Sequence, residues 1–463
     1  MWLYCTIKTR DGTDIFLVAK IKNVRNASMK KIVSFLLAAL LIFGLVGCGK
    51  QKEGNTAEED NAVNTDQNDT EPKTDVELLV EKAGGYIYGV CHPNENYMRL
   101  KDLGLGWVRF DIPYPYESDG KTLRREYTEF KNRAKEYTKN KFKVLAITPY
   151  PRDFLDIGGY DPGTTANAAR VREIAVFLVN DLRDVIAGIQ ISNELNHSGH
   201  IRPFTTLQQA ADFIGKQAKA INDIKGDLIV GYNSAGYSTT WNNMMKSYLK
   251  YMDYVALDLY YGTFDTGTLD SYVNDVNRLY QAVKKPILMA EFGYSCKGSP
   301  TEEDRAAKLA SYGYASEAEA RADIVNLVEK LPETFKTLIK NNYPNTADWG
   351  KAVFETYGNH FYGYNKRISG TWDDVDLSEP DITHDEEGQA NYFRQLIPLL
   401  MEQKCLIGFF IYCWKDRTWC LTCGYDDCPN ETSWGLVDDN GNRKKPSYFA
   451  VKEAIAALRE AGK

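Results

Sequence analysis

Short apolar segments alternate with longer amphipathic segments over most of the chain. Eight of the apolar segments have the length of buried strands, and they span residues 86–90, 106–110, 143–147, 186–191, 228–232, 254–259, 286–290 and 407–412. Between them lie stretches with apolar residues at helical spacing, such as residues 171–182 and 207–221. Strands that are continuously apolar and alternate with helices indicate a parallel sheet buried on both faces. Eight such units predict an α/β fold, a (β/α)8 TIM barrel.

The connection between the seventh and eighth predicted strands is much longer than the others. Residues 385–401 have the pattern of the regular helix that returns to the last strand, which leaves about residues 298–383 as a large insertion between strand 7 and strand 8. Strand 7 ends at the C-terminal face, where the active sites of barrel enzymes lie. We therefore expect the insertion to shape a binding cleft.

The first 77 residues do not share this alternation. Met29 is followed by two lysines and by an apolar run over residues 32–46, which ends in Gly47 and Cys48. A positive start and a short apolar run are typical of a secretion signal, and the end of the run resembles a bacterial lipobox, in which the cysteine takes a lipid. An uncleaved anchor helix is the alternative. The expected organisation is an upstream extension, a lipoprotein signal peptide with its lipobox, a polar disordered tether and a barrel domain, over residues 1–28, 29–48, 49–77 and 78–463.

Composition narrows the class of protein. Charged residues make up 26% of the chain and hydrophobic residues 43%, with a net charge of −7. These values exclude a mainly disordered, collagen-like or multi-span membrane protein. An acidic chain without a basic stripe is also repelled by phosphate, so we expect no nucleic-acid partner. The 30 Tyr, 19 Phe and 8 Trp residues exceed the needs of a core, and exposed aromatic faces suit sugar rings.

Two carboxylates follow predicted strands at the positions where barrel enzymes carry their catalytic residues. Glu194 follows strand four within Asn193-Glu194, and Glu291 follows strand seven within Glu291-Phe292-Gly293. Glycoside hydrolysis needs such a pair, one carboxyl to protonate the leaving oxygen and one to attack the sugar or activate water. A single glutamate after an apolar run is more often a helix N-terminal acid that complements the helix dipole. The pair on strands four and seven favours chemistry.

Together these motifs resemble those of the retaining (β/α)8 glycoside hydrolases of clan A, such as families 5, 39 and 113. The resemblance covers most of residues 85–455 and includes the segments 107–110, 258–261, 434–438 and 445–448. It implies that Glu194 is the general acid/base and Glu291 the nucleophile. It also implies that Asn193 hydrogen-bonds the sugar 2-hydroxyl, a contact that strengthens in the transition state.

The resemblance further implies a set of substrate-binding residues. Arg109 and Tyr260 would lie beside Glu291, Trp414 would form the floor of the subsite for the reacting sugar, and His92 would reach a sugar hydroxyl. Taken singly, Arg109 also fits a structural ion pair, and Trp414 and Tyr260 fit core aromatics. Three loop tyrosines either line outer subsites or pack within their loops, namely Tyr114, Tyr116 and Tyr150.

Three cysteines lie close together in the loop after strand eight, at Cys420, Cys423 and Cys428. Their C-x2-C-x4-C spacing fits three ligands of a zinc site, and Cys413, Asp426 or Asp427 could supply a fourth. A loop disulfide is as plausible in an exported protein, and we expect no metal ion. We expect no role for these cysteines in the chemistry, and no cofactor.

The sequence thus predicts a retaining β-glycoside hydrolase that cleaves a β-linked polysaccharide or oligosaccharide at a bacterial cell surface by double displacement. The expected partners are the glycan and, through a lipid on Cys48 alone, the membrane, and the expected state is a monomer. A non-catalytic carbohydrate-binding lipoprotein and a transglycosylase are the alternatives. Binding alone does not need both carboxylates and Asn193, whereas a transglycosylase would use the same residues.

Overall fold

The computed structural model describes residues 2–8, 14–20 and 72–463, apart from residues 95, 198, 299–300, 364–366, 369–370 and 373–376. The chain divides into two compact units, Met1–Thr70 and Glu71–Lys463. In the first, β1 (Trp2–Lys8) pairs with β2 (Asp14–Lys20) in an antiparallel hairpin. The predicted signal peptide, Cys48 and most of the predicted tether lie outside the described residues. Within the described residues, no helix has both the length and the apolar character needed to cross a membrane.

The second unit is built on a closed barrel of eight strands. In barrel order these are β3 (Ile87–Cys91), β4 (Trp107–Asp111), β5 (Lys143–Ile147), β6 (Gly188–Gln190), β7 (Ile229–Ala235), β8 (Tyr254–Leu259), β9 (Ile287–Phe292) and β12 (Leu406–Ile411). Each strand pairs in parallel with both neighbours, and β12 closes the ring against β3. The predicted (β/α)8 TIM barrel is confirmed, with a strand at each of the eight predicted segments.

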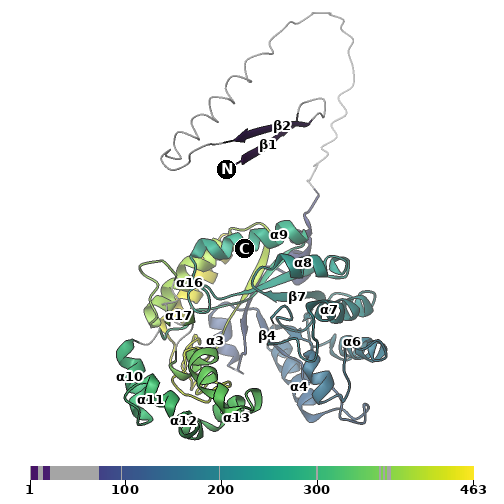
Figure 1. The fold of residues 1–463 in the computed structure, drawn as a ribbon. Helices are drawn as coiled ribbons and strands as arrows, with labels where there is room; N and C mark the ends of the chain where they lie inside the picture. Colours follow the sequence, from purple (N-terminus) through teal and green to yellow (C-terminus); the bar gives the residue numbers. More distant parts are fainter. Residues whose placement is uncertain are drawn as a thin grey trace, which may run out of the picture. The chain divides into compact units, whose positions relative to one another are not determined.

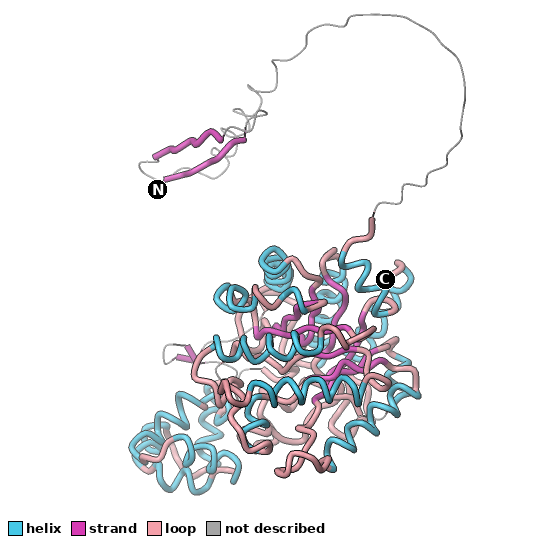
Figure 2. Tube along the Cα trace, turned by 90° about the vertical axis from the view of Figure 1, so that its right-hand side faces the viewer, coloured by secondary structure: helices cyan, strands magenta, loops and turns pink. Residues whose placement is uncertain are grey.

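Helices surround the barrel, and Figure 2 shows the magenta strands inside the cyan helices. They are α3 (Tyr97–Asp102), α4 (Arg125–Lys139), α5 (Pro151–Asp156), α6 (Ala168–Leu182), α7 (Leu207–Ile221), α8 (Thr239–Met245), α9 (Leu269–Val283), α16 (Glu386–Met401) and α17 (Pro446–Glu460). The apolar stripes predicted on α6 and α7 are buried against the strands. Their packing forms the main hydrophobic core, between the barrel and its helical layer.

An additional helix, α2 (Asp75–Ala83), packs against the residues at the N-terminal end of the barrel interior. Its buried face consists of Val76, Leu79 and Ala83. Thr74 and Glu77 form a capping box, in which each side chain accepts a hydrogen bond from the other's backbone N–H. The last three residues of the segment that composition assigns to the tether, 75–77, belong to this helix, because its apolar face covers the end of the barrel.

The segment between β9 and α16 forms a helical layer of its own beside the barrel (Figure 1). It contains α10 (Glu302–Ser311), α11 (Glu317–Ala322), α12 (Ile324–Lys330), α13 (Glu333–Asn342), α14 (Trp349–Lys351) and α15 (Gly358–Phe361). Two short strands, β10 (Arg367–Ile368) and β11 (Thr371–Trp372), pair with one another. The helices enclose a second hydrophobic cluster, which includes Leu327, Phe335 and Phe354 and also residues of the loop after β12. The segment is therefore tied to the barrel through that loop.

Candidate active site

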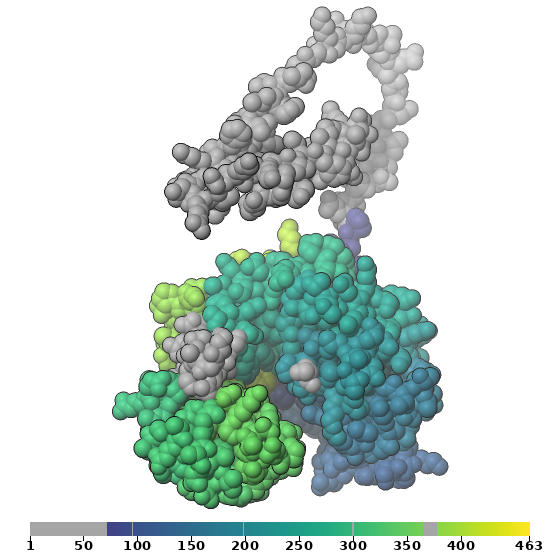
Figure 3. Space-filling view, viewed as in Figure 1, coloured from purple at the N-terminus to yellow at the C-terminus, as the bar shows by residue number. Residues whose placement is uncertain are grey.

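The polar residues that follow the barrel strands converge on one another. Arg109 lies on β4, Asn193 and Glu194 follow β6, Tyr260 follows β8, and Glu291 lies on β9. These five predicted site residues form one connected network of hydrogen bonds and electrostatic contacts. Figure 3 shows a hollow between the green helices of the segment that follows β9 and the blue residues around α4.

Arg109 organises the network from beneath. The residue is 1% exposed, and its Nη1 lies 2.6 Å from Glu291 Oε1. Its Nη2 donates to Asn193 Oδ1 over 2.7 Å, and its Nε donates to Gln190 Oε1 over 3.0 Å. A buried guanidinium is tolerated only when paired and hydrogen-bonded. Arg109 therefore fixes the side chains of β6 and β9 relative to β4.

Glu291 is held in its ionised form. Its Oε1 accepts from Arg109, and its Oε2 accepts a hydrogen bond from the Tyr260 hydroxyl. Burial by itself would raise the pKa of Glu291, but the Arg109 charge and the two hydrogen bonds outweigh burial and lower this pKa below its ordinary value. The carboxylate is thus charged and oriented at neutral pH, as a nucleophile requires.

Glu194 experiences the opposite environment. Burial, followed by the negative charge of Glu291, raises the pKa of Glu194 to about 7. Asp258 on β8 hydrogen-bonds Glu194, and burial together with both glutamate charges raises the pKa of Asp258 well above its ordinary value. Burial and the acidic neighbours therefore favour the protonated form of Asp258, which has a hydrogen to donate to Glu194. Two carboxyls whose neighbours shift their pKa values in opposite directions can act as a proton donor and a nucleophile.

The backbone around these residues is strained. His92, Ser192 and Glu194 adopt φ angles of 50°, 57° and 50°, a region that non-glycine residues seldom occupy. Such conformations cost about 1–3 kcal/mol each and cluster at functional sites. Two hydrogen bonds hold this backbone: the Glu194 N–H donates to Asn233 Oδ1 over 2.9 Å, and the Ser192 N–H donates to Thr148 Oγ1 over 3.0 Å. The strain is consistent with a site shaped for a ligand.

Asn193 is positioned by its carbonyl oxygen. Its Oδ1 accepts from Arg109, from Gln190 over 3.0 Å and from Asn233 over 2.7 Å. Its Nδ2 has no acceptor in the part of the chain that the structure describes. The orientation of the amide is therefore fixed, and its N–H groups remain available to a hydroxyl group of a ligand.

The structure does not bring Trp414 into this network. Trp414 is fully buried and packs against Tyr448 of α17, with the ring centroids 6.4 Å apart. Tyr412 and Trp434 instead pack edge-on around Tyr260, at 5.8 and 5.3 Å. The side-chain direction past the end of a strand is not set by the alternation of the strand, so the sequence could not distinguish Tyr412 from Trp414.

The remaining predicted residues divide between the site and the core. His92 is exposed and packs edge-on against Tyr412 at 5.6 Å. The ring centroids of Tyr150 and His200 lie 6.1 Å apart. Burial and the nearby acidic groups of the site raise the pKa of Tyr150. Tyr114 packs on Phe154 and Tyr116 packs on Phe177, which is the loop-packing alternative.

Sequence reasoning missed several residues of the network, namely Gln190, His200, Asn233, Asp258 and Tyr412. His200 Nδ1 lies 3.3 Å from Glu194 Oε2 without hydrogen-bond geometry, and burial lowers the pKa of His200 to about 4, so its ring is neutral. Asp258 offered a signal, because a carboxyl within an otherwise apolar strand is costly unless it has a role. His200 offered none, because it comes from a loop whose path the sequence does not define.

The position directly after Glu291-Phe292 has no room for a side chain, and Gly293 occupies it. A Cβ atom on Gly293 would lie 2.1 Å from the Tyr412 carbonyl oxygen. The close approach of the segments after β9 and β12 therefore requires glycine, and it places Tyr412 next to the site.

No family model and no curated protein matches this chain. Among solved structures it is similar to a family 2 β-galacturonidase from Eisenbergiella tayi, with 13% identity and a TM-score of 0.43 over 81% of this chain and 51% of that chain. It is also similar to the family 53 catalytic domain from Ignisphaera aggregans, with 16% identity and a TM-score of 0.45 over 81% of this chain and 92% of that chain. A third similar structure is a family 39 glycoside hydrolase from Bacteroides cellulosilyticus, with 13% identity and a TM-score of 0.49 over 80% of this chain and 63% of that chain. The chain spans about half of the galacturonidase and under two thirds of the family 39 enzyme. Because one fold hosts many functions, the function is inferred from the site.

Proposed function

We propose that the protein is a retaining β-glycoside hydrolase that cleaves a β-linked polysaccharide or oligosaccharide. One observation carries the proposal. Glu194 and Glu291 share one buried network at the ends of β6 and β9. Their neighbours raise the pKa of Glu194 and lower the pKa of Glu291. A proton donor and an ionised carboxylate are the two groups that double displacement at a sugar needs.

In the first step, the Glu291 carboxylate attacks the anomeric carbon while Glu194 gives its proton to the leaving oxygen. The glycosidic bond breaks, and a covalent glycosyl ester forms on Glu291. In the second step, Glu194 accepts a proton from water, whose oxygen attacks the same carbon and releases the sugar and the Glu291 carboxylate. Glu194 is then protonated again for the next turnover.

The neighbouring residues assist through the charges that develop. Tyr260 keeps Glu291 oriented, and Arg109 keeps it ionised until attack. Asn193 would donate to the sugar 2-hydroxyl, a contact that strengthens in the oxocarbenium-like transition state. Tyr412, rather than Trp414, would form the aromatic floor, since it packs beside Tyr260.

We further propose that the enzyme acts at the bacterial cell surface as a monomer anchored through a lipid on Cys48. This proposal rests on the sequence alone, with its positively charged start, its short apolar run and Gly47-Cys48. Replacement of Cys48 by alanine should move the protein from the membrane fraction to the soluble fraction. Unchanged membrane fractionation would contradict the lipid anchor.

The test of the activity is sugar release by residues 72–463 from β-mannan, β-glucan, xylan and aryl β-glycosides. Glu291→Gln should abolish release from whichever substrate is cleaved. Glu453→Gln, an exposed glutamate on α17, is the matched control and should retain full activity. The anomer of the first product, observed by NMR, should be the anomer of the substrate. The opposite anomer would contradict the retaining mechanism.

A second variant separates the two carboxyl roles. Glu194→Ala should still form the glycosyl ester from an aryl glycoside with a good leaving group, because that group needs no proton. Azide should then restore turnover and give a β-glycosyl azide, since a small anion occupies the space of the missing carboxylate. Products of transfer to added sugar acceptors would favour the transglycosylase, and oligosaccharide binding without turnover would favour the binding lipoprotein.

A further inference from the structure

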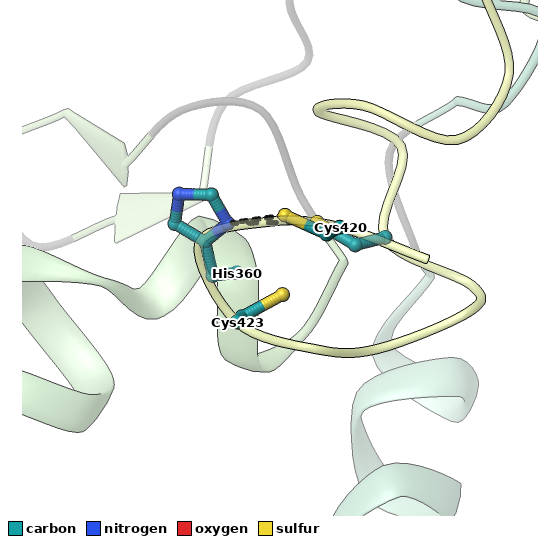
Figure 4. Close-up of side chains that lie close together, drawn as sticks. His360, Cys420 and Cys423 are labelled. Carbon is teal, nitrogen blue, oxygen red and sulfur yellow. Dashed lines mark hydrogen bonds between the residues drawn. The ribbon is translucent and has the colours of Figure 1, made fainter. Parts of the chain in front are cut away.

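A cluster of metal-ligating side chains lies apart from the acidic pair. Cys420, Cys423 and Cys428 belong to the loop after β12, and His360 lies on α15 of the segment between β9 and α16. The four ligand atoms all lie within 4.8 Å of one another. The three cysteines are free thiols and fully buried. Figure 4 shows His360 facing Cys420, with Cys423 beside them.

The distances are those of a tetrahedral metal site. His360 Nδ1 lies 3.7 Å from Cys420 Sγ and 3.5 Å from Cys428 Sγ. Around a tetrahedral zinc ion, with Zn–S about 2.3 Å and Zn–N about 2.0 Å, a sulfur and a nitrogen are separated by about 3.5 Å. The imidazole nitrogen is therefore placed as a fourth ligand. The residues considered from sequence, Cys413, Asp426 and Asp427, are not part of the cluster.

The local backbone brings the thiols to one side of the loop. The Cys420 N–H donates to the Tyr425 carbonyl over 2.8 Å, and the Gly424 N–H donates to the Cys420 carbonyl over 2.7 Å. Gly424 has a φ of 77°, which glycine adopts without strain. Asn430 Nδ2 donates to Cys428 Sγ over 3.6 Å, the type of outer contact that supports a thiolate ligand.

We propose that Cys420, Cys423, Cys428 and His360 bind one zinc ion. Three thiolates and one imidazole complete the coordination of the ion, so the site is structural and leaves no position for a substrate. A disulfide would use two thiols and would give no reason for His360 to lie between two sulfurs. The ion joins two parts of the chain that are about 60 residues apart in sequence.

The ion would also support the acidic pair from a distance. Pro429 and Asn430, directly after Cys428, each accept a hydrogen bond from Trp434 Nε1 through their carbonyls, both over 3.0 Å. Trp434 packs on Tyr260, which donates to Glu291. Zinc thus helps to position Trp434 and Tyr260 and takes no part in the reaction.

The test is the metal content of the full chain, purified without chelator and measured by elemental analysis and native mass spectrometry. We expect one zinc per chain in the wild type and in Cys405→Ser, which alters a buried thiol outside the cluster. Loss of an outer contact weakens metal binding about 10- to 100-fold. Cys423→Ser and His360→Ala each remove a ligand, so their affinity for zinc should fall by more than that. His360→Cys should retain the ion, because four ligands remain.

Cobalt provides a readout independent of activity and of zinc carried through purification. Co²⁺ added to the chelator-treated chain should give the intense visible bands of a tetrahedral thiolate site, and these bands should be absent in Cys423→Ser. Two results would overturn the proposal. One is a wild type that binds neither metal and has two fewer titratable thiols than its sequence provides, as in a disulfide. The other is unchanged zinc in both Cys423→Ser and His360→Ala.

Discussion

Single residues decide how the site handles protons. Glu194 and Glu291 are the same amino acid, yet the Arg109 guanidinium stabilises the charge on one, while burial and the neighbouring negative charge oppose charge on the other. The difference comes from neighbours on other strands, so it is a property of the fold rather than of either glutamate.

The first prediction concerns the pH dependence of kcat/KM. The reactive form has Glu291 ionised and Glu194 protonated. As pH rises through about 7, Glu194 loses its proton and kcat/KM should fall. The pKa of Glu291 lies below its ordinary value of 4.5. As pH falls through this lowered pKa, Glu291 gains a proton and kcat/KM should fall again. Initial rates on an aryl glycoside give the profile, and activity that keeps rising above neutrality would contradict this assignment of roles.

The second prediction concerns the proton on Asp258. If Asp258 is neutral and donates to Glu194, Asp258→Asn preserves the charge and the donor, and the alkaline limb should stay near pH 7. Asp258→Ala removes the donor that stabilises ionised Glu194, and the limb should move to higher pH. An ionised Asp258 would give a different result, because Asp258→Asn would then remove a negative charge and shift the limb to lower pH.

The third prediction concerns the stability that Arg109 provides. Arg109→Met leaves Glu291 as an uncompensated buried charge, which should cost about 3–5 kcal/mol of unfolding free energy at neutral pH. Because Arg109 lowers the pKa of Glu291, its contribution exists above the ordinary pKa of 4.5 and is lost as pH falls through the native value. Urea unfolding should show a smaller cost in acid. Arg109→Met combined with Glu291→Gln is the control and should cost less than the single change.

At the scale of elements, the sequence was informative wherever a regular pattern was buried. The strand over residues 254–259 and the helix over residues 207–221 have the predicted bounds, because buried faces force apolar residues into a fixed period. The partners of Glu291 were predicted through a resemblance, whereas Tyr412 and His360 were missed. Their positions depend on loop paths and on contacts between distant segments, which no local period records.

The fourth prediction concerns α2 and the N-terminal end of the barrel. Leu79 is 6% exposed, so Leu79→Ala should destabilise the protein by about 2 kcal/mol or more. Leu78 is 51% exposed on the same helix, and Leu78→Ala should change stability by at most about 0.5 kcal/mol. Urea unfolding of both variants of residues 72–463 makes the comparison. Equal effects would mean that α2 does not close the barrel.

At the scale of the whole molecule, the second unit has separate hydrophobic clusters. The helices between β9 and α16 enclose one with the loop after β12, while the barrel and its helices enclose the others. Parts of a protein with separate cores can open separately. The segment that borders the hollow can therefore loosen while the strands that position Glu194 and Glu291 stay paired.

The fifth prediction follows from this separation. Leu327 on α12 is fully buried in the cluster of the inserted helices, so Leu327→Ala should speed amide exchange in α10–α15 and in the loop of Cys420, while the barrel strands stay protected. Val325→Ala, an exposed change on the same helix, is the control. On the proposed function, the variant should lose more activity on a polymer, which spans the cleft, than on a small aryl glycoside. Equally fast exchange in the barrel strands would show that both clusters unfold as one unit, and the inserted helices could not then adjust independently of the carboxyl pair.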